Sequence, residues 1–273
     1  GTAFRDEIPL ATNIGLVKTT SSEWHTLEAG HVLPLFDALP NSDIFRTWNV
    51  EGTPARVIGV NQTPPSFTLL SVPDIARNDF VLVSDCARAD IVQACAITQQ
   101  SASTVLSVSS SCSPGNKPSI RLVSFASVKS PAEAMRIQST LFYVGKRGAD
   151  ETNPPALFRR SLGSDGLPEA AEELVEGVES IQLLYGISEA HSANSSVQAY
   201  LTADKVSDFS RVVSVRLNLL MQSVDYTQSL PNQEYEFNAV VYAALGSAGL
   251  PADRRLRRGF SATYYLRNRG LGL

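Results

Sequence analysis

The regular alternation of apolar and polar residues is the feature that most limits what this chain can fold into. In the best example, Val215, Leu217 and Leu219 fall on one face of an extended segment. Arg216 and Asn218 fall on the other face. A period of two residues is typical of a β-strand with one buried face. The sequence therefore predicts a β-rich fold.

Other segments extend this prediction along the chain. Two of them show the same alternation, and two are apolar enough for strands that are buried on both faces. The alternating segments are residues 181–187 and 260–266, and the apolar ones are residues 67–72 and 80–83. Stretches rich in Gly, Pro, Asn and Ser supply turn chemistry between them and predict loops. These are residues 52–65, 107–118, 146–155 and 188–196.

Helical signals are fewer and weaker. Residues 168–178 begin with proline and then carry Glu169, Glu172 and Glu173, acids that suit a helix N-terminus. Residues 131–138 are a second candidate for a short helix. The expected class is α+β, mainly β, with antiparallel sheets and a few short helices. We expect one globular domain over residues 1–273, with a possible irregular N-terminal subdomain over residues 1–65.

Composition and motifs narrow the function. A hydrophobic content of 43% in 273 residues allows a sizeable core. The net charge of −4 gives no global attraction to nucleic acid or to an anionic membrane. The sequence has no basic, apolar leader and no apolar run long enough for a membrane span, so this chain is expected to be soluble. Phosphate-loop, zinc-protease and serine-hydrolase motifs are also missing, so we expect no enzyme activity, no cofactor and no metal.

An arginine cluster near the end of the chain is the main charged feature. Its members are Arg254, Arg255, Arg257, Arg258, Arg267 and Arg269. A strip of arginines could bind DNA phosphates. The alternative, which we favour, is that these side chains make subunit contacts or block unwanted strand pairing at a sheet edge. Nucleic acid is therefore not an expected partner.

Several short segments together resemble one known family. The first is Phe80-Val81-Leu82-Val83-Ser84-Asp85-Cys86-Ala87-Arg88-Ala89-Asp90-Ile91, a strand that runs into Ser-Asp-Cys and Ala-Asp-Ile. The others follow in the family's order, at residues 141–144, 156–159, 173–179, 181–186, 212–223 and 257–269. Over residues 66–273 the chain resembles the PilW family of type IV pilus minor pilins.

The resemblance implies a structural role. Such proteins join a hydrophobic N-terminal helix, absent from this sequence, to a β-rich pilin-like head. The implied function is to prime or cap pilus assembly at the filament tip. The implied partners are other minor pilins, the major pilin, a tip adhesin and, through the helix, the inner membrane. The head would face the periplasm before assembly and lie in the extracellular pilus afterwards.

Two alternative functions remain. One is a J-type pseudopilin of type II secretion, which is similar in plan, and the other is a DNA-binding uptake pilin. Motility, adhesion and DNA uptake remain open as the purpose of the pilus.

A periplasmic location would allow one disulfide among three cysteines. Cys95 with Cys112 is the favoured pair, because it would close a Ser-rich, charge-free loop. Closure of a loop of that size stabilises by about 3 kcal/mol in the chain-entropy model. Cys86 remains the alternative partner of either residue.

Overall fold

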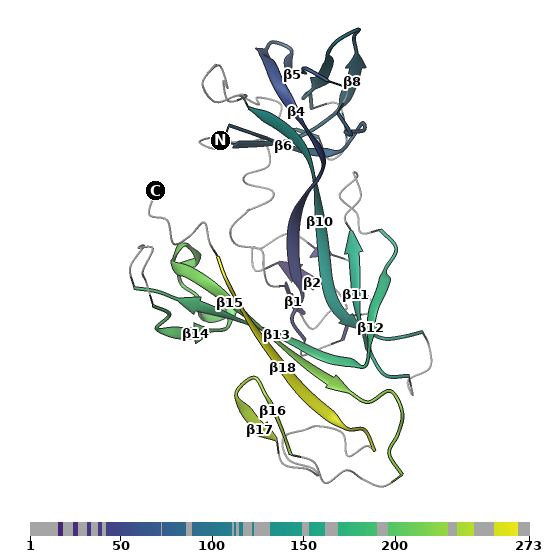
Figure 1. Ribbon diagram of the computed structural model, residues 1–273, viewed down its shortest axis with the longest axis vertical. Helices are drawn as coiled ribbons and strands as arrows, with labels where there is room; N and C mark the ends of the chain where they lie inside the picture. The colour runs from purple at the N-terminus through teal and green to yellow at the C-terminus, as the bar shows by residue number, and fades with distance from the viewer. Residues whose placement is uncertain are drawn as a thin grey trace. The chain divides into compact units, whose positions relative to one another are not determined.

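The computed structural model describes residues 16–18, 24–26, 32–33, 38–39, 42–71, 73–85, 89–110, 112, 115–116, 122, 132–148, 153–161, 169–189, 196–228, 234–242 and 254–266. These residues form mainly antiparallel β-structure (Figure 1). The chain divides into two compact units that are discontinuous in sequence. One comprises residues 1–10, 47–140 and 161–170, and the other comprises residues 11–46, 141–160 and 171–273.

The first unit is built around long and short strands that share one apolar core. Its strands are β5 (Pro65–Leu69), β6 (Phe80–Ser84), β7 (Ala89–Gln93), β8 (Ala96–Gln99), β9 (Thr104–Ser107) and parts of β4 (Phe45–Gln62) and β10 (Glu133–Gly145). The pairing order is β4-β5-β9-β8 in one set and β10-β6-β7 in the other. Phe67, Val81 and Leu106 are fully buried in the core between them. This burial accounts for the apolar character of the strands.

The second unit contains the four-stranded sheet that carries the candidate site. Its order is β14-β13-β15-β18, with β14 at Ala199–Leu201, β13 at Val178–Ile187, β15 at Val212–Gln222 and β18 at Arg257–Tyr265. The unit also holds β11 (Ala156–Ser161), β12 (Glu172–Glu176), a three-stranded sheet and a two-stranded hairpin. The three-stranded sheet is β1 (Leu16–Lys18), β2 (Trp24–Thr26) and β3 (Val32–Leu33), and the hairpin is β16 (Tyr235–Phe237) with β17 (Val240–Tyr242).

The predicted mainly β class is confirmed, and so are the strands predicted from alternation. β13, β15 and β18 coincide with the three alternating segments, and β6 covers the apolar segment 80–83. β5 covers residues 67–69 of the apolar segment 67–72, and Leu70 beyond its end is 50% exposed. Ile181, Leu183 and Tyr185 are buried on one face of β13, as the period of two requires. Helix is much scarcer than expected. Within the described residues it is limited to two short 3-10 turns, Ala203–Lys205 and Phe209–Arg211.

The helix predicted over residues 168–178 is wrong. From Glu172 to Glu176 this segment is strand β12, which pairs antiparallel with β11. Two of the acids that suggested a helix N-terminus, Glu172 and Glu173, instead face arginines, and so does Glu176. Glu172 accepts from Arg159 Nε at 2.7 Å, Glu173 accepts from Arg147 Nε at 3.0 Å, and Glu176 accepts from Arg147 Nη1. These partners are distant in sequence, so local propensity could not anticipate them.

The short helix predicted over residues 131–138 is also wrong, because most of this segment belongs to β10. Ala134 lies opposite Val83 of β6 in the antiparallel register. Both residues are fully buried in the core of the first unit. Burial against a neighbouring strand outweighs the helical propensity of alanine.

The loop predicted over residues 52–65 is wrong for most of its length. β4 continues to Gln62, and only a tight turn at residues 63–64 separates it from β5. Ala55 is buried, and Val57 and Val60 pack against the same core. The irregular character expected of residues 1–65 therefore does not hold for β4. Most of residues 1–41 lie outside the described part. The predicted domain organisation stays a prediction. It is one head, with a possible subdomain over residues 1–65 and a PilW-like region over residues 66–273.

Candidate functional site

The strand β18 forms one side of the four-stranded sheet. Its register with β15 places Phe260 opposite Leu219 and Tyr264 opposite Val215. Leu219 and Val215 pack against the core of the second unit. The side chains of Phe260 and Tyr264 are thus on the core face of the sheet, at its outer strand. Within the described part of the chain, β18 pairs with β15 alone.

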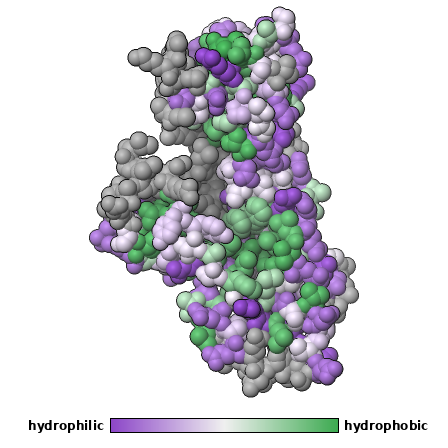
Figure 2. All heavy atoms as spheres, in the orientation of Figure 1, coloured by the Kyte–Doolittle hydropathy of each residue, from purple (hydrophilic) through white to green (hydrophobic). Residues whose placement is uncertain are grey.

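Large aromatic side chains on β18 are exposed. Phe260 is 46% exposed, Tyr264 60% and Tyr265 69%. On the face of the molecule shown in Figure 2, hydrophobic residues lie in separate patches with hydrophilic residues between them. Aromatic residues are enriched in protein–protein interfaces. Phe260 and Tyr264 share one face of the strand, whereas Tyr265, the next residue, points to the opposite face. We call Phe260 and Tyr264 the β18 aromatic surface, and it is the best candidate for a contact with another subunit.

A short hairpin covers part of the other face of this sheet. The hairpin consists of β16 and β17, with Asn238 and Ala239 at its turn. Both turn residues have positive φ, 53° for Asn238 and 60° for Ala239. Gly259 of β18 lets the hairpin approach closely, since a Cβ atom there would lie 2.0 Å from the carbonyl oxygen of Glu236. The glycine therefore determines how the hairpin sits on the sheet.

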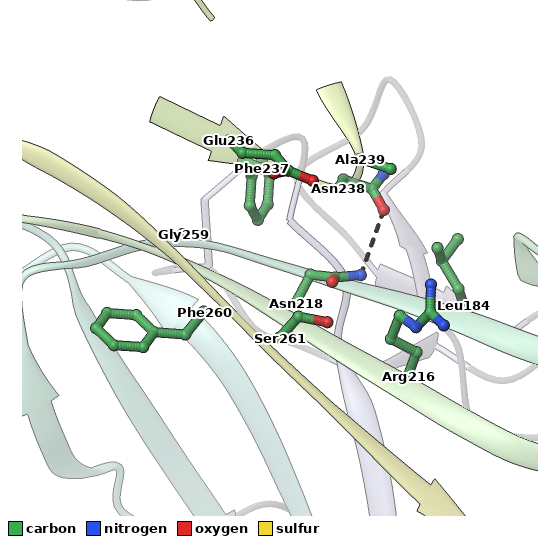
Figure 3. Close-up of a pocket in the computed structure, with 10 residues that line it drawn as sticks. All are labelled: Leu184, Arg216, Asn218, Glu236, Phe237, Asn238, Ala239, Gly259, Phe260 and Ser261. Atoms are coloured by element: carbon green, nitrogen blue, oxygen red, sulfur yellow. Dashed lines mark hydrogen bonds between the residues drawn. The ribbon is translucent and has the colours of Figure 1, made fainter. Parts of the chain in front are cut away.

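A cavity of about 240 Å³ lies between this hairpin and the sheet (Figure 3). The sheet contributes Leu184, Arg216, Asn218, Gly259, Phe260 and Ser261, and the hairpin contributes Glu236, Phe237, Asn238 and Ala239. Asn218 Nδ2 donates to Asn238 Oδ1 at 3.3 Å, and Figure 3 shows the two amides pointing toward one another. Sequence reasoning missed this cavity. The Asn-Ala turn between two short apolar runs was the one local signal of a hairpin there.

The predicted arginine cluster does not form one exposed strip. Arg255 and Arg257 are buried, with 5% and 7% of their surface exposed. Arg255 Nη1 donates to the carbonyl oxygens of Ser223 and Val224. Arg257 Nε donates to Glu179 Oε2 at 2.7 Å. These two guanidinium groups are therefore hydrogen-bonded in the interior and are not part of an exposed strip.

Other members of the cluster have a different environment. Arg254 and Arg258 are exposed. The Arg258 guanidinium lies 5.2 Å from the centre of the Phe260 ring, and the Arg254 guanidinium lies 5.8 Å from that of Tyr226. Arg267 and Arg269 lie outside the described residues. A basic patch on this surface stays a prediction, and only Arg254 and Arg258 of the described members could take part in it.

The disulfide present in the structure joins Cys95 to Cys112, whose Cα atoms are 5.1 Å apart. Cys86 lies outside the described residues. The loop that the bond closes has a second anchor that sequence reasoning missed. Gln93 is fully buried, and its Oε1 accepts from Gly115 N at 2.7 Å. Asn116 Nδ2 donates to Gln93 O at 2.9 Å, and Asn116 Oδ1 accepts from Gln93 N at 2.8 Å. Polar contacts thus hold a loop with little apolar content.

Two further features of the described residues concern metal ions and membranes. No group of three or more His, Cys, Asp or Glu side chains there is arranged to hold a metal ion. His25 lies in β2, and His31 and His191 lie outside the described residues. None of the described segments forms a helix that is long and apolar enough to cross a membrane.

A match to a known family covers a large part of the second unit. Residues 141–268 match the model of the family PilW, described as type IV pilus-assembly protein W. The resemblance to PilW is confirmed over these residues. The PilW-matching region begins within β10 and ends just after β18, so it includes the β18 aromatic surface and the cavity.

The first segment of the predicted resemblance, residues 80–91, lies outside the PilW-matching region. For that part of the chain the resemblance rests on the sequence motif alone. No curated protein matches the chain. No solved structure matches it either.

Proposed function

We propose that this chain is the head of a minor pilin that primes or caps type IV pilus assembly at the filament tip. The match of residues 141–268 to a pilus-assembly family is the observation that supports this role most directly. In this proposal the protein is a structural subunit and not an enzyme. Its partners are other minor pilins, the major pilin and a tip adhesin.

The proposed location follows from the same family. The head would face the periplasm before assembly, held at the inner membrane by the hydrophobic helix of PilW-type proteins. It would then lie in the extracellular part of the pilus. The Cys95–Cys112 disulfide is compatible with these oxidising compartments.

Head-to-head contact through the β18 aromatic surface is the proposed mechanism. Burying half-exposed aromatic side chains against a neighbour contributes roughly 25 cal/mol per Å² of apolar surface. Phe260 and Tyr264 are already ordered on a strand, so less side-chain entropy is lost on binding. The surface is therefore suited to join a second subunit.

The test is a gene deletion in the source bacterium, with surface pili counted by electron microscopy. We expect few pili after deletion and normal numbers when the full-length wild-type gene is restored. The double variant Phe260→Ser/Tyr264→Ser should restore fewer pili at equal protein level. Leu70→Ser is the matched control, because Leu70 is 50% exposed but lies in the first unit.

Two outcomes would contradict the proposal. Normal pili after deletion, combined with loss of protein secretion, would instead identify a J-type pseudopilin. Submicromolar DNA binding that disappears in Arg254→Gln/Arg258→Gln would favour the uptake pilin.

A further inference from the structure

The cavity between the β16–β17 hairpin and the sheet has the chemistry of a small-molecule site. We propose that it binds one ring of a saccharide. The proposal concerns residues within the second unit and does not depend on the role in pilus assembly.

The charges of the cavity favour a neutral ligand. Arg216 and Glu236 both line it, so their formal charges cancel. A site for phosphate or a carboxylate would need an excess of positive charge. The rest of the lining is uncharged. A ligand that complements this lining is therefore polar without a net charge.

The hydrogen-bonding groups favour a ligand rich in hydroxyls. Asn218 and Asn238 are bonded to each other through one donor and one acceptor, so each amide keeps further capacity. Toward other described residues, the hydroxyl of Ser261 and the carboxylate of Glu236 make no side-chain hydrogen bond. Donors and acceptors thus lie side by side in the cavity. Sugar hydroxyls, which donate and accept at once, fit such a mixture.

The apolar lining and the volume of the cavity further restrict the class of ligand that it could bind. Phe237 and Leu184 supply apolar surface beside the amides, which suits the C–H face of a sugar ring. A volume of about 240 Å³ is below the roughly 300–1,000 Å³ of pockets for drug-sized ligands. A single ring fits this space, and a longer glycan would extend into solvent.

The backbone of the turn positions the Asn238 amide. Asn238 and Ala239 have φ values of 53° and 60°, the conformation that a two-residue hairpin turn requires at both central residues. In this turn the Asn238 amide points toward Asn218 (Figure 3) and accepts its hydrogen bond.

Saturation-transfer NMR on the full 273-residue chain tests the proposal. The probes are the methyl glycosides of glucose, galactose, mannose, N-acetylglucosamine and N-acetylgalactosamine at millimolar concentration, with inorganic phosphate as a separate probe. We expect saturation transfer from the protein to at least one glycoside. Added phosphate should not reduce this signal. Asn238→Gly keeps the turn conformation and removes the amide, so affinity should fall about fivefold.

A pair of bulky variants gives the sharpest control. Ser261 and Ala262 are adjacent and exposed, but only Ser261 lines the cavity. Ser261→Trp should fill the cavity and abolish glycoside binding, whereas Ala262→Trp should retain it, with equal melting temperatures in circular dichroism. Absence of binding by all five glycosides, binding of phosphate in their place, or unchanged binding in Ser261→Trp would each overturn the proposal.

Discussion

At the scale of single residues, buried charges are the most informative feature of the second unit. Arg257 and Glu179 form a bidentate pair, at 2.7 Å and 3.3 Å, although they are 78 residues apart in sequence. Their side chains are only 7% and 17% exposed. An ion pair in such a place stabilises little in net terms, but the loss of one partner leaves a buried charge without compensation.

Replacement of this arginine should therefore be strongly destabilising. We expect Arg257→Ala to lower the free energy of unfolding by about 3–5 kcal/mol, measured by urea denaturation. The control is Arg258→Ala, because Arg258 is the next residue and is exposed. This substitution should change the free energy of unfolding by no more than about 0.5 kcal/mol. Equal effects of the two substitutions would show that the Glu179 contact does not stabilise the fold.

The carboxyl group of Asp43 should make stability depend on pH. Burial raises the pKa of Asp43 above its ordinary value of 3.8, and the charge of Asp204 adds to the rise. The hydrogen bond from Leu183 N, at 2.7 Å, acts in the opposite direction and lowers the pKa. The folded protein therefore binds the proton more tightly than the unfolded chain. The contribution of Asp43 to stability is therefore complete below pH 3.8 and is lost as the pH rises through the folded pKa.

Asp43→Asn should remove this dependence, because the amide stays neutral and still accepts from Leu183 N. Urea denaturation at a series of pH values measures it. The free energy of unfolding of the wild type minus that of the variant should decrease as the pH rises from 3.8 to the folded pKa. A difference that increases with pH would show that the carboxylate is stabilised in the fold, contrary to the direction given.

At the scale of elements, close backbone approach holds the β16–β17 hairpin on its sheet. Gly259→Ala would place a Cβ atom 2.0 Å from the Glu236 carbonyl oxygen, so the hairpin must move. We expect a loss of stability of about 1–3 kcal/mol, as for other overpacked sites. Amide exchange of residues 235–242 should also accelerate. The control is Gly59→Ala in β4, where the nearest atoms are 3.4 Å away. Unchanged exchange in Gly259→Ala would contradict this account of the hairpin.

The loop closed by Cys95 and Cys112 is held by a covalent bond and by the Gln93–Asn116 contacts. Cys95→Ala/Cys112→Ala should reduce the free energy of unfolding by about 3 kcal/mol, as expected for a bond that spans 17 residues. Dithiothreitol should lower wild-type stability to the same level and leave the double variant unchanged. A stabilising or neutral effect of the double substitution would show that the polar contacts suffice.

At the scale of the whole molecule, the family resemblance and the compact units divide the chain in different ways. The PilW match starts at residue 141, which is also where one segment of the second unit begins. The second unit adds residues 11–46 and 269–273 to that region, and the first unit interrupts it at residues 161–170. The two candidate surfaces, on β18 and in the cavity, both belong to the second unit.

The sequence by itself determined the β class and the positions of the main strands. Alternation is a local property, since each residue's face follows from its neighbours in an extended chain. For that reason β13, β15 and β18 could be predicted from their own residues. The two predicted helices failed because their residues pair with distant strands, β11 in one case and β6 in the other.

Only the tertiary structure decided which polar residues lie inside and where a ligand could enter. Arg257 and Arg258 are adjacent and chemically identical, but only Arg257 meets Glu179 in the interior. Likewise, nothing local to Gly259 reveals that the Glu236 carbonyl will approach it. The contact of Glu236 with Gly259 depends on how β18 and the hairpin meet, although 14 residues of chain lie between the two elements. Burial and cavities arise from these long-range contacts, whereas strand formation needs only the local pattern.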